Sequence, residues 1–168
     1  MVNQMRDYKH FETWYKRVAW FGIFLNMLFV IPCFFFPAWI LGLLDLEFEP
    51  MIWAQAAGML LFIISVFYIP AILDLKKYRA NAWIAIIPSR MCGFSFFFIS
   101  VFFLGAPVGF IPISMVDLLI LCPQALILLN INRIERGEQP FSRAINISVI
   151  VALFLFIGAT IKAALQMI

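Results

Sequence analysis

The chain has 168 residues, of which 65% are hydrophobic and only 12% are charged, and its mean hydropathy is +1.02. A soluble domain is nearer half apolar and a quarter charged, and a globular core of this size cannot hide so much apolar surface from water. The composition therefore excludes an ordinary water-soluble domain and predicts that lipid surrounds most of the chain. The net charge of +3 lies in short clusters between apolar runs, which is typical of membrane orientation signals and not of a nucleic-acid-binding patch.

Five apolar runs are long enough to cross a bilayer, whose hydrocarbon core of about 30 Å takes about 20 apolar residues per helix. None of them alternates every two residues as the strands of a membrane β-barrel do. The predicted fold class is an all-α integral membrane protein with five transmembrane helices, a four-helix bundle plus a C-terminal helix. The predicted helices cover residues 18–36, 51–73, 82–104, 112–131 and 145–168.

These helices and the charged clusters between them divide the chain into four parts. The predicted parts are an amphipathic interfacial N-terminal segment over 1–17, a four-helix transmembrane bundle of two hairpins over 18–133, a cytoplasmic loop over 134–144 and a fifth transmembrane helix over 145–168.

The segment 1–17 has the pattern of an amphipathic helix. Tyr8, Phe11 and Tyr15 share one helical face, and basic residues occupy the other. Such a helix lies in the headgroup plane of the membrane, which is the predicted position of this segment. An ordinary cytoplasmic tail with aromatic residues near the membrane is the alternative.

The stretch 36–45 follows the first predicted span and is too apolar for a free loop. Two arrangements fit it: the first helix continues past a kink at Pro37, or the stretch lies along the outer surface of the membrane.

Arg90 is a fixed positive charge inside the third apolar run. It lies about ten residues from the end of that run, which is roughly 13–15 Å deep at 1.5 Å per residue. An arginine near the bilayer centre costs at least ~2.5 kcal/mol, so it is expected to face protein or water and to have a polar partner.

Polar residues of other spans are predicted to lie at the depth of Arg90. Asp117, in the fourth span, is the only acidic residue well inside a predicted span and is the natural counter-charge. The predicted buried polar cluster, a candidate ligand site, consists of Arg90, Asp117, Gln124, Ser65 and Ser89. Three interpretations stay open: a structural pair, a site for an acidic ligand, lipid headgroup or quinone, and a path for protons or ions.

Proline residues interrupt three of the spans in their inner halves. Each proline removes a backbone hydrogen bond and exposes a carbonyl one turn earlier, so Pro70, Pro88 and Pro123 are predicted helix kinks. Kinks around a buried charge can form a polar cavity, as in transporters with broken helices. Neighbouring side chains can equally satisfy the freed carbonyls.

Basic residues predict the orientation of the chain. Ten of the twelve Lys and Arg residues fall before the first span, between the second and third, or between the fourth and fifth, and the opposite loops contain none. Because the positively charged side is cytoplasmic, the N-terminus is predicted in the cytoplasm and the C-terminus outside.

Motifs for catalysis and metal binding are absent from the sequence. His10 is the only histidine, and no CxxC, HxxxH, GxSxG or P-loop pattern occurs. Haem held by two histidines of this chain, zinc hydrolysis, serine esterase chemistry and ATP binding therefore have no support. The chain is not expected to be an enzyme on its own. No cofactor is expected to be bound covalently or through His or Cys ligands, and lipid or quinone is the candidate bound group.

The fifth predicted span carries Ala159 and Ala163 with small-xxx-small spacing. Small residues let helices approach closely, so these two alanines form a predicted helix-contact face. The aromatic richness and short loops suit a chain that packs against other membrane protein subunits.

Several short motifs resemble those of small bacterial four-helix membrane proteins of the DoxX-like type. They are Phe36-Pro37, Leu41-Gly42-Leu43, Gly58, Arg90-Met-Cys-Gly93 and Asp117. The resemblance covers residues 18–133 and leaves the fifth helix unmatched. Some members of that family resemble membrane subunits of quinone-linked oxidoreductases, so the resemblance implies a bacterial inner-membrane location and makes Arg90 and Asp117 the core polar positions.

The functional prediction is a non-catalytic integral membrane subunit that anchors or scaffolds a larger bacterial inner-membrane complex, with a link to respiration or electron transfer. The alternative is a small transporter or a lipid- or quinone-binding carrier that uses the Arg90 site. A third interpretation is a component of a quinone-coupled oxidoreductase whose redox centre lies on another polypeptide.

Overall fold

The computed structural model describes residues 2–46 and 50–167, and every regular element within them is a helix. The elements are, in chain order, α1 (Val2–Phe35), α2 (Pro37–Leu43), α3 (Ile52–Leu73), α4 (Arg79–Ile84), the π-helix η1 (Ala85–Met91), α5 (Cys92–Leu104), the 3-10 helix η2 (Val108–Phe110), α6 (Ile111–Glu135) and α7 (Arg143–Leu165).

Five helical stretches of the described residues are long and apolar enough to cross a membrane. The prediction of an all-helical protein with five helices able to cross a membrane is thus confirmed, by the length and composition of the helices. The third span is a continuous stack of α4, η1 and α5, and α6 extends four residues past the predicted end of the fourth span.

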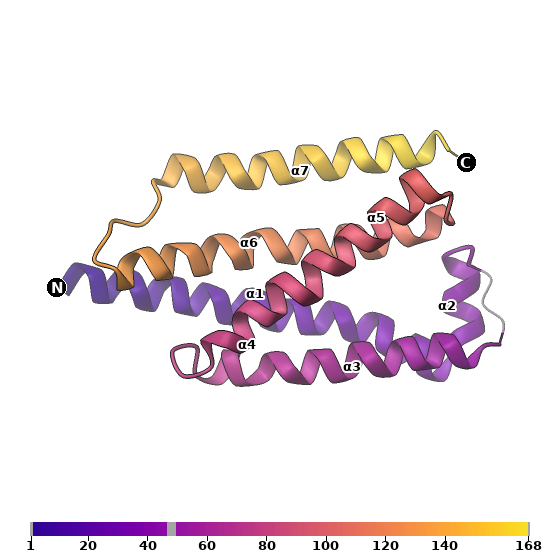
Figure 1. Cartoon of the computed structure of the whole chain (residues 1–168), viewed down its shortest axis with the longest axis horizontal. Helices are drawn as coiled ribbons and strands as arrows, with labels where there is room; N and C mark the ends of the chain where they lie inside the picture. The colour runs from indigo at the N-terminus through magenta and orange to yellow at the C-terminus, as the bar shows by residue number, and fades with distance from the viewer. Residues whose placement is uncertain (1, 47–49, 168) are drawn as a thin grey trace.

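Helix α1 is longer than the first predicted span. It runs without a break from Val2 to Phe35, so no helix boundary separates the segment 1–17, of which residue 1 lies outside the described residues, from the apolar run after it. Figure 1 shows α1 as one long rod. The amphipathic segment is therefore the first part of a spanning helix, and its position in the headgroup plane stays a prediction.

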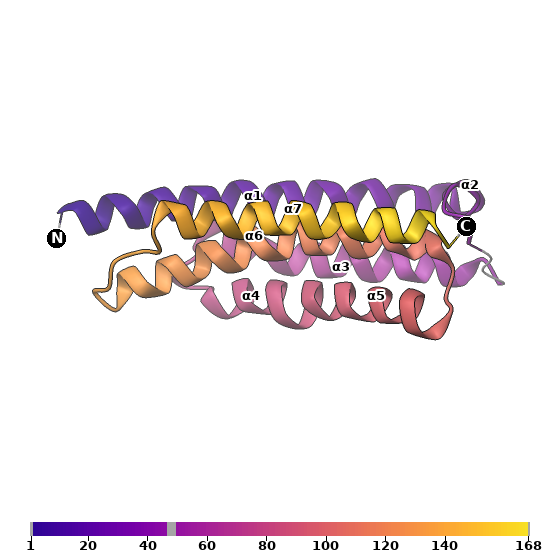
Figure 2. The ribbon, with the colours of Figure 1, turned by 90° about the horizontal axis from the view of Figure 1, so that it is seen from above.

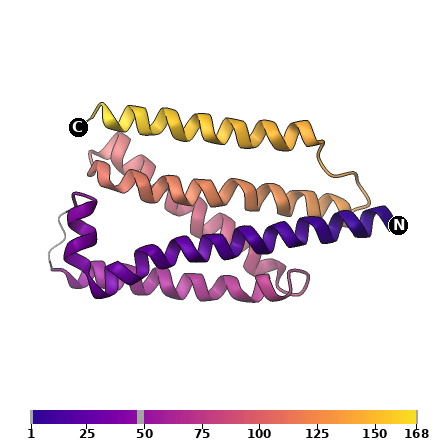
Figure 3. The ribbon, with the colours of Figure 1, turned by 180° about the vertical axis from the view of Figure 1, so that it is seen from behind.

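The stretch 36–45, which follows α1, forms the separate short helix α2. The backbone of Phe36 leaves the helical region, with φ −137° and ψ 51°, and Pro37 then occupies the first turn of α2, where a missing N–H costs nothing. Figures 1 and 3 show α2 running across the end of the bundle. The first helix therefore does not continue straight past Pro37.

Helix α6 lies at the centre of the arrangement, where it contacts α1, α5, η1 and α7, while α3 packs against α1. Figure 1 shows α7 on the side of α6 away from α3, and Figure 2 shows α7 running along the length of the bundle. The four-helix part therefore surrounds a shared interior. Helix α7 packs mainly against α6, and its Phe156 also meets Phe94 and Phe98 of α5.

The largest apolar cluster lies at one end of the bundle, where α1, α3, α4 and α6 meet. Its fully buried members include Tyr15, Ala71, Leu75, Ala82 and Leu128. Two smaller clusters lie towards the other end, one under α2 and one between α5, α6 and α7. The middle of the bundle, between these clusters, is polar.

The prolines of the three spans have different effects. Helices α3 and α6 continue through Pro70 and Pro123 without a break in helix assignment. Pro88 lies within the π-helical turn η1, which is the one place where the α-helical pattern of the third span is replaced. Because proline has no N–H to donate, the turn around it widens instead of closing an α-helical bond.

Much of the outer surface is apolar. Phe35, Phe103 and Leu155 are 68%, 75% and 70% exposed, and of the most apolar stretch of α7 only 11% is buried, against 39% for α6. In water such a surface would drive aggregation, whereas acyl chains solvate it without cost. Helix α7 therefore presents most of its surface to lipid or to another protein.

Candidate functional site

Arg90 occupies the centre of the bundle and is 2% exposed. Its Nη1 donates a hydrogen bond to Oδ1 of Asp117 at 2.8 Å, and its Nη2 donates to Oδ1 of Asn26 at 3.2 Å. Its Cζ lies 5.7 Å from the ring centre of Tyr68, within reach of a cation–π contact. The guanidinium thus has a counter-charge, an amide acceptor and an aromatic ring around it.

Hydrogen bonds continue from Arg90 to the remaining helix of the bundle. Asn26 donates through Nδ2 to Oγ of Ser65 at 2.8 Å, and the Ser65 hydroxyl donates to the carbonyl of Leu61 at 2.8 Å. The hydroxyls of Tyr68 and Ser89 are also hydrogen-bonded to each other. One polar layer, called the Arg90 layer below, therefore joins α1, α3, η1 and α6.

Two glycines leave the space that this layer needs. A Cβ atom at Gly22 would lie 3.0 Å from Nη2 of Arg90 and 3.1 Å from Cγ2 of Ile120, and one at Gly93 would collide with Oδ2 of Asp117. Because only glycine lacks this atom, α1 and α5 approach the charged groups more closely than other residues permit.

The Arg90 layer contains one positive and one negative side chain, Arg90 and Asp117, which neutralise each other. A buried ion pair compensates its desolvation only when further hydrogen bonds satisfy its polar atoms, and most atoms of this layer are satisfied. Two buried atoms near it lack a partner among the described residues: Nε of Arg90 and Oε1 of Gln124. The layer can therefore fix the relative positions of four helices. Nε of Arg90 and Oε1 of Gln124 remain able to form one further hydrogen bond each.

Most of the residues predicted for this site are brought together. Arg90, Asp117, Ser65 and Ser89 all belong to the layer, while Gln124 is buried on α6 at 2% exposure without a bond from its carbonyl oxygen. Whether the cluster holds a ligand stays a prediction.

Sequence reasoning missed Asn26 and Tyr68. Asn26 lies nine residues after Arg17, the same spacing from a charged helix end that selected Ser65 and Gln124. Depth counting applied to the first span would therefore have found it. Tyr68 gave no comparable signal, because a tyrosine in a membrane helix is as often apolar packing as a polar contact.

A second polar cluster lies where the described helices carry most of their charge. Arg79 donates through Nη1 to Oδ1 of Asn132 at 2.9 Å and through Nη2 to Oε1 of Glu135 at 2.6 Å. These bonds tie the start of α4 to the end of α6. The cluster is partly exposed and stabilises the junction of two spans.

Asn130 attaches α7 to the end of α6. Its Oδ1 accepts from the backbone N–H of Phe141 at 2.7 Å, and its Nδ2 donates to Oδ1 of Asn146 at 3.3 Å. The Ser142 hydroxyl caps α7 by accepting from the N–H of Ile145. The connection between α6 and α7 is therefore ordered by an amide network.

The predicted helix-contact face of α7 is only partly covered by the rest of the chain. Ala159 is exposed and Ala163 is half-buried, whereas Leu153, Thr160 and Ala164 are the buried residues of this helix. The Ala159–Ala163 face is thus open to an outside helix, and its contact stays a prediction.

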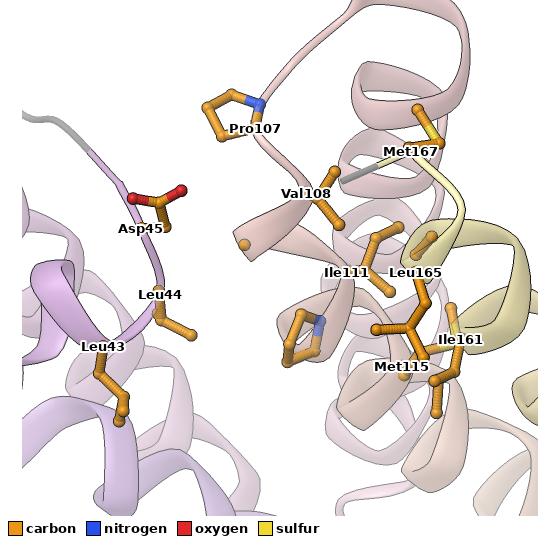
Figure 4. Close-up of a pocket in the computed structure, with 13 residues that line it drawn as sticks. Leu43, Leu44, Asp45, Pro107, Val108, Ile111, Met115, Ile161, Leu165 and Met167 are labelled. Carbon is orange, nitrogen blue, oxygen red and sulfur yellow. The ribbon is translucent and has the colours of Figure 1, made fainter.

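Three cavities lie away from the Arg90 layer, and none of them is lined by Arg90, Asp117 or Asn26. The largest, about 630 Å³, separates the end of α2 from the start of α6 and the end of α7 (Figure 4). Figure 4 shows apolar side chains on both sides of it, with Asp45 at its edge. A second cavity of about 440 Å³ lies under α2 and is lined mainly by aromatic and aliphatic residues. The third, about 470 Å³, lies between α1, α6 and α7.

No group of three or more His, Cys, Asp or Glu side chains within residues 2–46 and 50–167 is arranged to hold a metal ion. The three cysteines, Cys33, Cys92 and Cys122, are unpaired.

Comparison with known proteins found no match: no protein family, curated protein or solved structure is significantly similar to this chain.

Proposed function

We propose that the chain is a non-catalytic integral membrane subunit that anchors or scaffolds a larger bacterial inner-membrane complex. The observation that supports this role most strongly is the Arg90 layer, in which the buried charge is neutralised by Asp117 of the same chain. A buried charge that is paired within the chain can fix helix positions, and it needs no external ligand to neutralise it.

The outer surface supports the same role. Helix α7 contacts the rest of the chain chiefly through α6, and it leaves Ala159 exposed and Ala163 only half-buried. A rigid four-helix part with one lightly attached apolar helix suits a protein that binds neighbouring subunits in the membrane. The resemblance to DoxX-like proteins extends the proposal to an assembly linked to respiration or electron transfer.

The proposed orientation has the N-terminus in the cytoplasm and the C-terminus outside, because the Lys and Arg residues cluster at one end of the bundle. The test uses a cysteine-free variant with Lys77→Cys or Pro107→Cys, both at exposed positions. A membrane-impermeant maleimide added to intact cells should label position 107 and leave position 77 unlabelled. The reverse pattern would overturn the orientation.

Purification of the full chain in a gentle detergent tests the subunit role. We expect other membrane polypeptides to co-purify in a fixed stoichiometric ratio, measured by the mass of the native particle and of its components. A particle that contains only copies of this chain would contradict the proposal.

A second candidate function, a transporter or lipid- or quinone-binding carrier, is favoured by one observation. The π-helical turn η1 contains Arg90, and Nε of Arg90 and Oε1 of Gln124 lack partners. π-Helical turns occur frequently at functional sites. A homomeric particle that retains a small molecule, and loses it on Arg90→Leu while Gln55→Leu retains it, would favour this carrier over the subunit.

A further inference from the structure

The cavity of about 470 Å³ is a groove with three helical walls. Its residues come from the first part of α1, the end of α6 and the start of α7, which lie at the same end of the molecule (Figure 1). This volume falls in the range of roughly 300–1,000 Å³ that small-molecule sites occupy. The groove opens sideways, because α7 contacts α6 and leaves a space towards α1.

The walls of the groove are apolar over most of their length. Val18 and Ile127 line it from α1 and α6, and Ile147 and Val151 line it from α7, where they are 53% and 51% exposed. Residues 143–151 of α7 extend for about 12 Å at 1.5 Å per residue. That length approaches half of a hydrocarbon core ~30 Å thick, so the groove matches one leaflet in depth.

The mouth of the groove is positively charged. Arg143 lines it and forms no hydrogen bond or ion pair with residues 2–46 or 50–167. Trp14 lines the same groove from α1, and the guanidinium of Arg17 lies 5.2 Å from the Trp14 ring centre. The first 17 residues hold four Lys and Arg residues against two acidic ones, Asp7 and Glu12, and Glu12 already pairs with Lys16.

The neighbouring polar groups of the groove are already satisfied. Asn130 and Asn146 bind each other and the connecting loop, so their amides hold the helices in place. The groove thus combines an apolar floor, the Trp14 ring and the guanidinium of Arg143, and Arg17 lies next to the groove on the Trp14 ring. Tryptophan and arginine are typical of the level of the lipid headgroups.

We propose that this groove binds one anionic phospholipid, with its phosphate beside Arg143 and Arg17 and an acyl chain along α6 between α1 and α7. A guanidinium binds a phosphate through two parallel, charge-assisted hydrogen bonds. The acyl chain of the lipid covers apolar groove walls that no other part of the protein covers. This site is separate from the Arg90 layer, so it does not depend on the proposed subunit role.

Fluorescence of Trp14 tests the site directly. A full-length variant that keeps Trp14 and replaces Trp20, Trp39, Trp53 and Trp83 by Phe is reconstituted in phosphatidylcholine bilayers. Brominated acyl chains, which quench tryptophan on contact, are then supplied on phosphatidylglycerol or on phosphatidylcholine at the same mole fraction. We expect stronger quenching by the brominated phosphatidylglycerol, and a preference that falls as salt is added.

Two pairs of variants separate charge from shape. Arg143→Gln should reduce the preference for phosphatidylglycerol about fivefold, while Lys162→Gln, the same charge change at the other end of α7, leaves it unchanged. Val151→Phe fills the groove and should reduce quenching by both lipids, whereas Val149→Phe, outside the groove, does not.

A measurement without tryptophan replacement guards against a misfolded variant. The unmodified chain should retain about one phosphatidylglycerol per chain through detergent gel filtration, and Arg143→Gln should retain less. Equal quenching by the two lipids would overturn the proposal. So would an equal loss in Lys162→Gln, or the absence of quenching by either lipid, which would mean that protein covers the groove.

Discussion

The Arg90 layer and helix α7 hold the chain together in opposite ways. In the layer, an ion pair and a series of hydrogen bonds join α1, α3, η1 and α6 at defined atoms. Helix α7 is held by a few buried residues, Leu153, Thr160 and Ala164, and by the amide network of Asn130 at its start.

This difference shows which contacts specify a membrane fold. Lipid tails are as apolar as leucine side chains, so an apolar contact between helices gains little from excluding lipid. A buried charge, in contrast, has no substitute partner in lipid and must find its own. We therefore expect the Arg90 layer to determine helix register in the bundle, and α7 to be able to exchange much of its contact surface with lipid or another helix.

The largest effect is expected from Asp117→Leu. The substitution leaves the Arg90 guanidinium buried without its counter-charge, which costs about 3–5 kcal/mol of unfolding free energy. The measurement is reversible unfolding in mixed micelles. The double variant Arg90→Met with Asp117→Leu is the control, because removing both charges should recover most of that loss. A single variant as stable as the unmodified chain would show that the pair does not hold the bundle.

Gly93→Val should have the next largest effect. Its side chain would occupy the position of Oδ2 of Asp117 and displace the carboxylate, at the upper end of the ~1–3 kcal/mol that overpacking costs. Gly158→Val is the matched control, because a Cβ at Gly158 meets open space. Equal losses of stability for the two variants would contradict the close approach described at Gly93.

Asn130→Ala should weaken the attachment of α7 more than the four-helix part. It leaves the N–H of Phe141 and Oδ1 of Asn146 without their partner, at a cost of about 1 kcal/mol. Hydrogen exchange should then become faster in α7 and stay unchanged in α3. The neighbouring Leu129→Ala, at an exposed position, is the control. Faster exchange throughout the bundle would mean that α7 is not a separate unit.

Ala159→Leu should have the smallest effect on the chain itself, below about 0.5 kcal/mol, because the side chain is exposed. The main effect is expected on the binding of partner subunits, since a leucine at this position keeps a helix of another subunit from approaching closely. Co-purification of partner polypeptides should fall, while Ala144→Leu, at the start of the same helix, retains them. Unchanged co-purification would remove Ala159 from the interface.

The pairing of Arg90 with Asp117 could be predicted from the sequence, because Asp117 is the only acidic residue well inside a predicted span. Asn26 could also have been predicted, because it lies nine residues from the charged end of its span, as Ser65 and Gln124 do. The continuity of α1 was also readable, since neither glycine nor proline occurs before Gly22 to end the helix.

Other features depend on three-dimensional contacts that a sequence pattern does not contain. Pro88 indicated a disturbance in the third span, but a kink and a π-helical turn are alternative responses to the same missing N–H. The face of α7 that packs against α6 was not readable from the sequence for a similar reason. Its helix is apolar on all sides, so periodicity does not distinguish the face that meets α6 from the face that meets lipid.

The π-helical turn η1 also acts as a rotational spacer. It closes its bonds over five residues instead of four and so holds about one residue more than an α-helical turn. Deleting one residue from Ala85–Met91 would restore α-helical winding and rotate α5 by about 100° relative to α4. The phenylalanines of α5 would then turn away from α6 and α7, so a one-residue change in length would alter which helix the aromatic half of the third span faces.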